Sequence, residues 1–199
     1  MSLTVRSESV SGVIPKFAKV FELFTGGFGF TAAALARHTS GVTLPAGALL
    51  QVNEATRECS PVKRARLAAY VATAATSVKF EPGHLFRVGD YVFIEGTATG
   101  GTIATITEGA TYDTIAFAAG VNINKGVAAG AWAQHVSTAN ATAGTAVVIN
   151  ANAIAAFPTT IEAGASVAAL RRGTVYKNRI QPIVTADSLP VTILLSDSN

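Results

Sequence analysis

The chain has 199 residues, a length that suits one domain or one domain with a small appendage. Hydrophobic residues make up 49% of it and charged residues only 14%, which excludes an intrinsically disordered protein. The formal net charge is +3 without any run of four basic residues, so nucleic-acid binding is not expected. Uncharged windows are interrupted by Thr, Asn, Gln and Gly, so none provides the roughly 18 apolar residues of a membrane span.

Cysteine content and the first residues bear on the cellular compartment. Cys59 is the only cysteine, which excludes an intrachain disulfide and a cysteine metal cluster. Residues 1–8 lack the basic and apolar regions of a secretory signal, so we expect a protein that is made and kept in a cytoplasm. Low charge with abundant Gly and Thr indicates that much of the surface contacts other protein.

The first zone, residues 1–40, carries phenylalanines around a glycine pair at positions 26 and 27. Their helical spacing after Pro15 predicts a short amphipathic helix that ends at this pair and has one aromatic face. That face either packs on the protein's own core or belongs to an arm that docks onto a neighbouring subunit. The aromatic residues at this spacing are Phe17, Phe21, Phe24 and Phe28.

The second zone, residues 41–137, is predicted to be a compact β module, because short β-prone segments alternate with turn signals. A Thr-rich hairpin is expected over residues 102–107 and 111–117. Residues 63–76 are ambiguous: their Ala-rich composition favours a helix, whereas Arg64 and Arg66 alternate with apolar residues and favour a strand, the interpretation that we prefer. Further strands are expected at residues 49–52, 77–80, 91–94 and 131–136.

The third zone, residues 138–199, begins with a linker of small polar residues. Strands are expected at residues 146–149, 174–176 and 191–195, and a short helix or a loop at residues 150–157. The predicted fold class is therefore mainly β: a small β-barrel or sandwich with an N-terminal arm or short helix and a C-terminal β-containing segment.

No residue pattern points to catalysis, a cofactor or a metal. His38, His84 and His135 lie far apart and lack metal-ligand spacing, and the chain has neither a nucleophile elbow nor a phosphate-binding loop. The carboxylate of Glu58 is expected to raise the pKa of the neighbouring Cys59 thiol, which makes it a poor nucleophile. We expect no enzyme; a small hydrolase with two carboxylates remains the catalytic alternative.

A basic cluster lies near the C-terminus, with four of the fifteen Lys and Arg residues within positions 171–179. Such a cluster binds a protein partner, forms a solvated strand face or binds phosphates, and Arg with Tyr is typical of protein interfaces. Together with the aromatic cluster, it defines the expected protein contacts: Phe17, Phe21, Phe24, Arg171, Arg172, Tyr176 and Arg179.

Several segments resemble the tailed-phage capsid decoration and head-fibre (auxiliary capsid) proteins, including those of the crAss-like type. The Phe-rich N-terminal segment is not part of this pattern. The resemblance lies in LPAGALL at 44–50, NEATR at 53–57, PVKRA at 61–65, VKFEPGHLFRVGDYV at 78–92, and RRGTVY at 171–176 with Arg179.

The resemblance implies a virion protein on the capsid exterior, made in the host cytoplasm. Such a protein binds the major capsid protein, stabilises or decorates the shell as a homo-oligomer (trimer or dimer), and performs no reaction. Neither a membrane nor nucleic acid is an expected partner. The alternative is a carbohydrate-binding adhesin module on the virion surface, which would need an exposed aromatic platform from Trp132, Tyr112 or Tyr91.

Overall fold

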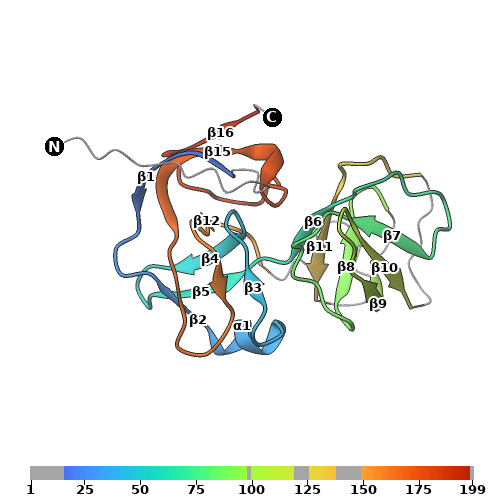
Figure 1. The fold of residues 1–199 in the computed structure, drawn as a ribbon, viewed down its shortest axis with the longest axis horizontal. Coiled ribbons are helices and arrows are strands. Elements are labelled where there is room, and N and C mark those ends of the chain that lie inside the picture. The colour runs from blue at the N-terminus through green and yellow to red at the C-terminus, as the bar shows by residue number, and fades with distance from the viewer. Residues whose placement is uncertain (1–15, 98–99, 119–125, 138–148, 198–199) are drawn as a thin grey trace.

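The computed structural model describes residues 16–97, 100–118, 126–137 and 149–197, which fold into two lobes that lie side by side (Figure 1). The protein is mainly β, as the sequence predicts. Residues 16–62 and 149–197 form what we call the base lobe. Residues 63–137, inserted between these two segments, form the inserted lobe. The second predicted zone is thus shared, with residues 41–62 in the base lobe and the rest in the inserted lobe.

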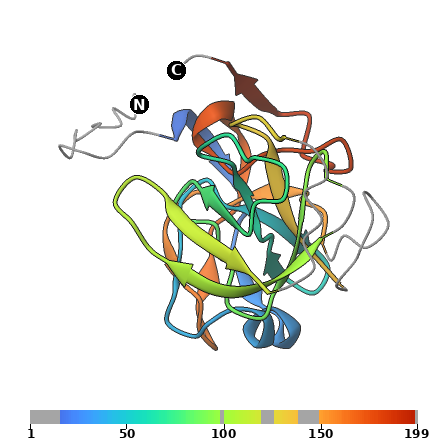
Figure 2. The ribbon, with the colours of Figure 1, turned by 90° about the vertical axis from the view of Figure 1, so that its right-hand side faces the viewer.

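The inserted lobe is one antiparallel sheet in the order β6-β11-β8-β9-β10-β7. Its two ends meet, because Leu67, just after β6, bridges Phe80 of β7 and Glu81 N–H donates to Arg66 O at 3.0 Å. The sheet therefore curls into a small barrel (Figure 2). Its strands are β6 (Arg64–Arg66), β7 (Ser77–Phe80), β8 (Tyr91–Ile94), β9 (Gly101–Thr107), β10 (Asp113–Phe117) and β11 (Trp132–Val136).

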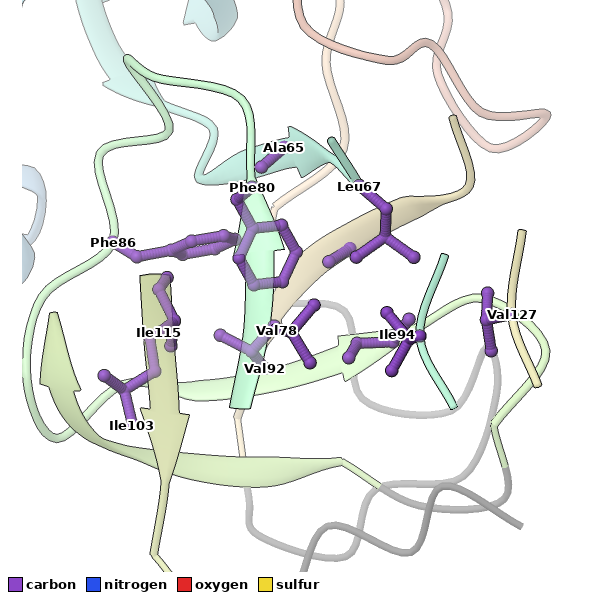
Figure 3. Packing of buried hydrophobic residues seen from close by; sticks show 12 residues of the cluster. Ala65, Leu67, Val78, Phe80, Phe86, Val92, Ile94, Ile103, Ile115 and Val127 are labelled. Carbon is purple, nitrogen blue, oxygen red and sulfur yellow. The ribbon is translucent and has the colours of Figure 1, made fainter. Parts of the chain in front are cut away.

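Apolar side chains at alternate positions of these strands fill the interior of the inserted lobe. In β7, Val78 and Phe80 are buried while Ser77 and Lys79 are exposed, the period of two that a half-buried strand requires. Phe80 and Phe86 meet edge to face with their ring centroids 5.9 Å apart. The cluster in Figure 3 includes Ala65, Leu67, Val78, Phe80, Phe86, Val92, Ile94, Ile103, Ile115 and Val127.

The base lobe contains a second curled sheet in the order β12-β4-β5-β2-β14. A bridge between Ala155 and Ala169 joins its two ends. The helix α1 follows β2, and its N-cap Thr31 accepts a hydrogen bond from Ala34 N–H at 2.9 Å. The elements are β2 (Phe28–Phe30), α1 (Ala32–Arg37), β3 (Thr43–Leu44), β4 (Leu49–Asn53), β5 (Glu58–Pro61), β12 (Ala153–Ile154), β13 (Thr159–Thr160) and β14 (Ser166–Val167), with β13 pairing β3.

A three-stranded sheet covers one side of the base lobe. It consists of β1 (Phe17–Leu23), β15 (Leu170–Tyr176) and β16 (Ile193–Ser196), with β15 in the middle, and the 3-10 turn η1 (Lys177–Arg179) follows β15. Its inner side packs on the curled sheet through a core cluster that includes Leu49, Leu170, Val175, Ile180 and Ile193. The opposite side faces solvent, so this sheet presents residues from both ends of the chain on one surface.

The predicted amphipathic helix over the phenylalanine cluster is wrong. Residues 17–23 form β1 instead, and a turn at Gly26 and Gly27 leads into β2. These glycines have φ of +83° and +62°, and a Cβ at Gly27 would meet Ser166 Oγ, so the pair makes a strand connection rather than a helix end. The described residues of the predicted arm are therefore built into the base lobe.

The structure confirms most of the remaining predicted strands. β4, β7, β8, β9, β10 and β11 lie at the predicted places, and β15 and β16 include most of the two C-terminal segments. The strand interpretation of residues 63–76 is correct for β6, after which the chain continues in turns. The expectation of a helix or loop at 150–157 is wrong for β12, and residues 146–148 lie outside the described part. No described helix is long and apolar enough to cross a membrane.

A buried ion pair fixes the two lobes against each other. Arg64 of β6 donates from Nη1 to Asp187 Oδ2 at 2.6 Å and to Pro182 O at 2.9 Å, and neither charged side chain is exposed. Asp187 also accepts backbone hydrogen bonds from Ala151 at 2.8 Å and Val184 at 2.9 Å. The inserted lobe is thus attached to the base-lobe loop that leads to β16.

We expect Arg64→Met to lower the free energy of unfolding by about 3–5 kcal/mol, because it leaves the Asp187 carboxylate buried without its counter-ion. Adding Asp187→Asn should recover part of the loss, since it removes the unpaired buried charge, although its single amide oxygen can accept only one of the two backbone hydrogen bonds. The exposed control Arg172→Met should change stability by less than about 0.5 kcal/mol. Denaturant unfolding measures all three; a loss below 1 kcal/mol in Arg64→Met would contradict the role of the pair.

Candidate functional site

The three-stranded sheet brings together all seven residues that the sequence predicts as protein contacts. Phe17 and Phe21 lie on β1 and Phe24 directly follows it, while Arg171, Arg172 and Tyr176 lie on β15 and Arg179 ends η1. The two strands pair antiparallel with Glu22 opposite Arg172. Segments separated by about 150 positions in the chain therefore lie side by side, as β1 and β15 in Figure 1.

The three phenylalanines nevertheless have different environments. Phe17 packs against the core between the two sheets, and Phe24 packs in the base-lobe core with its ring 5.5 Å from that of Phe28. Only Phe21 of the three is exposed, with 52% of its surface accessible. Phe17 and Phe24 thus take part in packing, and Phe21 is the one of the three whose ring is exposed to solvent.

Irregular pairing explains how one strand serves both purposes. The register of β1 against β15 shifts between Phe17 and Lys19, again between Val20 and Glu22, and again before Leu23. After each shift, the side chains that follow no longer keep the strict alternation between the two faces of the sheet. Phe17 and Leu23 can therefore face the core while Lys19 and Phe21, at odd positions between them, face solvent.

Cations hold the exposed ring of Phe21. Lys19 Nζ lies 4.5 Å from its centroid and the Arg172 guanidinium carbon lies 5.5 Å from it. Arg171 pairs with Glu22 at 3.0 Å, and Arg179 lies over the Tyr176 ring at 4.4 Å. These contacts orient long basic side chains without neutralising most of their charge. We call these residues the basic–aromatic surface: Lys19, Phe21, Glu22, Arg171, Arg172, Tyr176 and Arg179.

Aliphatic side chains extend this surface over β16. Leu194, which lies beside Thr174 in the parallel β15–β16 pair, is 62% exposed, and Val191 and Leu195 are also exposed. Exposed apolar groups that adjoin Arg and an aromatic ring are typical of protein-binding patches. The sequence interpretation missed Lys19, Glu22 and Leu194. Residues 17–21 (FAKVF) have no regular polar–apolar alternation that would have placed Lys19 on an exposed strand face.

The edges of this sheet are poorly suited to pairing with another strand. β1 carries three register irregularities and a lysine, and β16 has only four residues. Bulges, edge lysines and short edge strands are the usual means by which proteins prevent edge pairing. A partner is therefore expected to contact the side chains of the face rather than the backbone of an edge.

The histidine and aspartate that come closest to a catalytic pair are already occupied. His84 Nδ1 accepts a hydrogen bond from Phe86 N–H at 3.0 Å, and its Nε2 lies 3.2 Å from Asp113 Oδ2. Burial lowers the pKa of His84, so the ring is neutral at pH 7. Because Nδ1 accepts the hydrogen bond from Phe86 N–H, the proton of the neutral ring lies on Nε2, which faces Asp113 but has no hydrogen-bond partner among the described residues. The ring therefore has no free lone pair with which to take a proton from a substrate.

Neither of the two large clefts supplies a reactive thiol. The cleft of about 730 Å³ between the lobes is lined by His38, His84, Arg87, Glu108 and Asp113, among others. The cleft of about 650 Å³ on the base lobe reaches Cys59, but burial raises the pKa of this thiol to about 12. Within the described residues, no group of three His, Cys, Asp or Glu side chains could hold a metal ion.

The aromatic residues of the adhesin alternative do not form one platform. Trp132 and Tyr91 pack against a small cluster with Phe93, whose ring centroid lies 6.0 Å from that of Trp132. Tyr112 is exposed, but Lys79 Nζ lies 4.3 Å from its ring centroid. Comparisons of the chain with family models, with curated proteins and with solved structures gave no match.

Two further histidines lie where the chain passes between the lobes. His38 is 5% exposed and its Nε2 lies 3.4 Å from Pro61 O, while His135 Nε2 lies 3.8 Å from Asp90 Oδ1. Burial, assisted by the positive charge of Lys63, lowers the pKa of each to about 4. Both rings are therefore neutral in the folded protein at pH 7.

The lowered pKa values of His38 and His135 make the stability of the folded protein sensitive to acid. Between pH 6.5 and 4 the unfolded chain binds protons that the folded protein does not, so the free energy of unfolding should fall as pH falls, by up to about 1.4 kcal/mol per pH unit for each histidine. The double variant His38→Gln/His135→Gln should lose the part of this slope that these two rings cause, while His84, whose pKa burial also lowers, keeps its own part. Denaturant unfolding at several pH values tests it, and equal slopes in the two proteins would contradict the assignment.

Stability also tests the different environments of the phenylalanines. Phe17→Ala removes a ring that packs on the core, so a loss of about 2–3 kcal/mol is expected. Phe21→Ala removes an exposed ring and a cation contact, so the loss should stay below about 1 kcal/mol. Thermal or denaturant unfolding measures the loss of stability in each of the two variants. Equal losses would mean that Phe21 is also part of the packed core.

Proposed function

We propose that the protein is a structural component of a phage virion that binds the outer surface of the capsid and stabilises or decorates it without catalysis. The observation that carries this proposal is the exposed ring of Phe21, held by Lys19 and Arg172 on a sheet built from both ends of the chain. The resemblance to decoration and head-fibre proteins supplies the class of partner, the major capsid protein.

The chemistry of the surface supports a protein partner that offers carboxylates around an apolar contact. Arg172 and Lys19 present positive charge beside an aromatic ring, and Leu194 adds aliphatic area. Arg binds carboxylates through two parallel hydrogen bonds, and aromatic anchors with Arg dominate binding energy in protein interfaces. An acidic patch with a hydrophobic centre on the shell would complement this surface.

Stabilisation follows from binding alone. A ligand that binds the assembled shell and not its dissociated subunits shifts the equilibrium towards assembly by mass action. Homo-oligomerisation, as a trimer or dimer, belongs to the same proposal because several linked copies bind a symmetric lattice more tightly than one. Light scattering of the purified protein measures the oligomeric state.

We expect purified protein to bind capsids assembled without it, and Arg172→Glu or Phe21→Ala to weaken this binding at least tenfold, because a central anchor contributes more than about 1.4 kcal/mol. The protein offers a matched control in the inserted lobe, where Lys79 lies over the exposed ring of Tyr112. Lys79→Glu and Tyr112→Ala should bind as the wild type does. Point variants are preferable to deleting residues 1–30, because that deletion removes β1 and the fully buried Phe28.

Co-sedimentation with capsids, read as bound copies against free concentration, measures the affinity. Wild-type affinity in both surface variants would contradict the contact assignment. Failure of the wild type to bind capsids would contradict the function itself, and saturable binding to a glycan array in its place would favour the adhesin.

A further inference from the structure

The passage between the lobes contains more positive than negative charge. Lys63 Nζ lies 2.6 Å from Asp90 Oδ2, and Arg87 Nε lies 3.6 Å from Asp90 Oδ1. The same Oδ2 accepts a hydrogen bond from Arg87 N–H at 2.9 Å, so the carboxylate is fully engaged. Arg37 is close enough to lower the pKa of Lys63 and of His135 electrostatically. Among the described residues, Asp90 is the one carboxylate that contacts this group of three permanent cations.

A small cavity opens among these residues. It is lined by Arg37, His38, Lys63, Gln134 and His135, together with the apolar side chains of Pro61, Val62 and Ile149, and its volume is about 10 Å³. Such a volume holds about one water-sized species. The polar part of the lining consists of four basic side chains and one amide, with no carboxylate in it.

Arg37, one of the cations at this cavity, has a buried hydrogen-bond donor without a partner among the described residues. Arg37 Nε is buried and has no hydrogen-bond partner in the described part of the chain, while Nη2 reaches only Ser60 Oγ at 3.4 Å. An unpaired buried donor on a charged group costs more than a neutral one, so an ordered water or an ion that accepts its hydrogen bond usually occupies such a site.

We propose that this cavity binds one small inorganic anion, such as chloride, between the two lobes. Its size excludes phosphate or a carboxylic acid. Its lining favours a negative ion over water because it holds two permanent cations, Arg37 and Lys63, and no carboxylate, and Arg37 makes no ion pair among the described residues. The ion completes the hydrogen bonding of Arg37 and offsets the field of Lys63. Because Arg37 ends α1 of the base lobe and Gln134 and His135 belong to β11, the bound ion joins the lobes. This site is separate from the basic–aromatic surface, and the proposal of an anion does not depend on the proposed function.

The test uses the full chain, with chloride exchanged for gluconate at constant ionic strength and pH 7. Wild-type Tm should rise by about 3 to 6 °C at a chloride concentration of ten times the Kd. Arg37→Gln should lose the rise, while the control Arg172→Gln, on the exposed surface, should keep it. Equal Tm values of the wild type in the two salts, or an undiminished rise in Arg37→Gln, would overturn the proposal.

Crystals grown in bromide give an answer that does not depend on whether Arg37→Gln folds. An anomalous scattering peak between Arg37 and Lys63 in the wild-type protein is expected. If bromide-saturated crystals show no anomalous peak at that position but an ordered water molecule, the assignment of an anion is overturned.

Discussion

The position of one guanidinium determines how the two lobes meet. Arg64 is fully buried, and its charge is compensated by Asp187 and by a backbone carbonyl, Pro182 O. A buried charge of this kind is costly unless each of its partners keeps its place, so the pair stabilises a single relative position of the lobes rather than adding much net stability. Arg66, two residues along, donates to Lys177 O at 2.9 Å and repeats the attachment at η1.

This constraint extends to the basic–aromatic surface. Asp187 accepts hydrogen bonds from the loop that leads to β16, and Arg66 holds the turn where Arg179 lies. Both ends of the connection from β15 to β16 are therefore supported by the inserted lobe, although that lobe contributes no strand to the sheet. A surface supported in this way keeps its side chains in position before a partner arrives, which reduces the ordering cost of binding.

The sequence indicated the strands but not how distant segments combine. Alternation is a local property: it identified β7, where burial follows a period of two, and β6, where Arg64 and Arg66 alternate with apolar residues in the sequence. Thr-rich segments on either side of a turn identified the β9–β10 hairpin. The pairing of β1 with β15 is non-local, and nothing in residues 17–23 shows that their partner lies about 150 residues away. The spacing of Phe17, Phe21 and Phe24 matched a helix by coincidence, because three register shifts turn two of these rings into different core clusters. Similarly, the alternation of Arg64 predicted a strand but gave no sign that the guanidinium is the buried side.

The net charge of +3 gives a poor picture of what the protein presents to a partner. Several of its cations are used internally: Lys63 and Arg64 are buried in ion pairs, and Arg57 donates to Thr25 O and Gly27 O while its guanidinium lies 4.3 Å from the Phe28 ring centroid. The exposed cations that remain are concentrated on β1, β15 and η1, where Glu22 and Asp197 compensate them only in part. A chain with few charges can therefore build a strongly directional surface, because it neutralises charge within its core and concentrates exposed charge where β1 and β15 lie side by side. For such a protein the location of exposed charge, and not its sum, indicates which partner it binds.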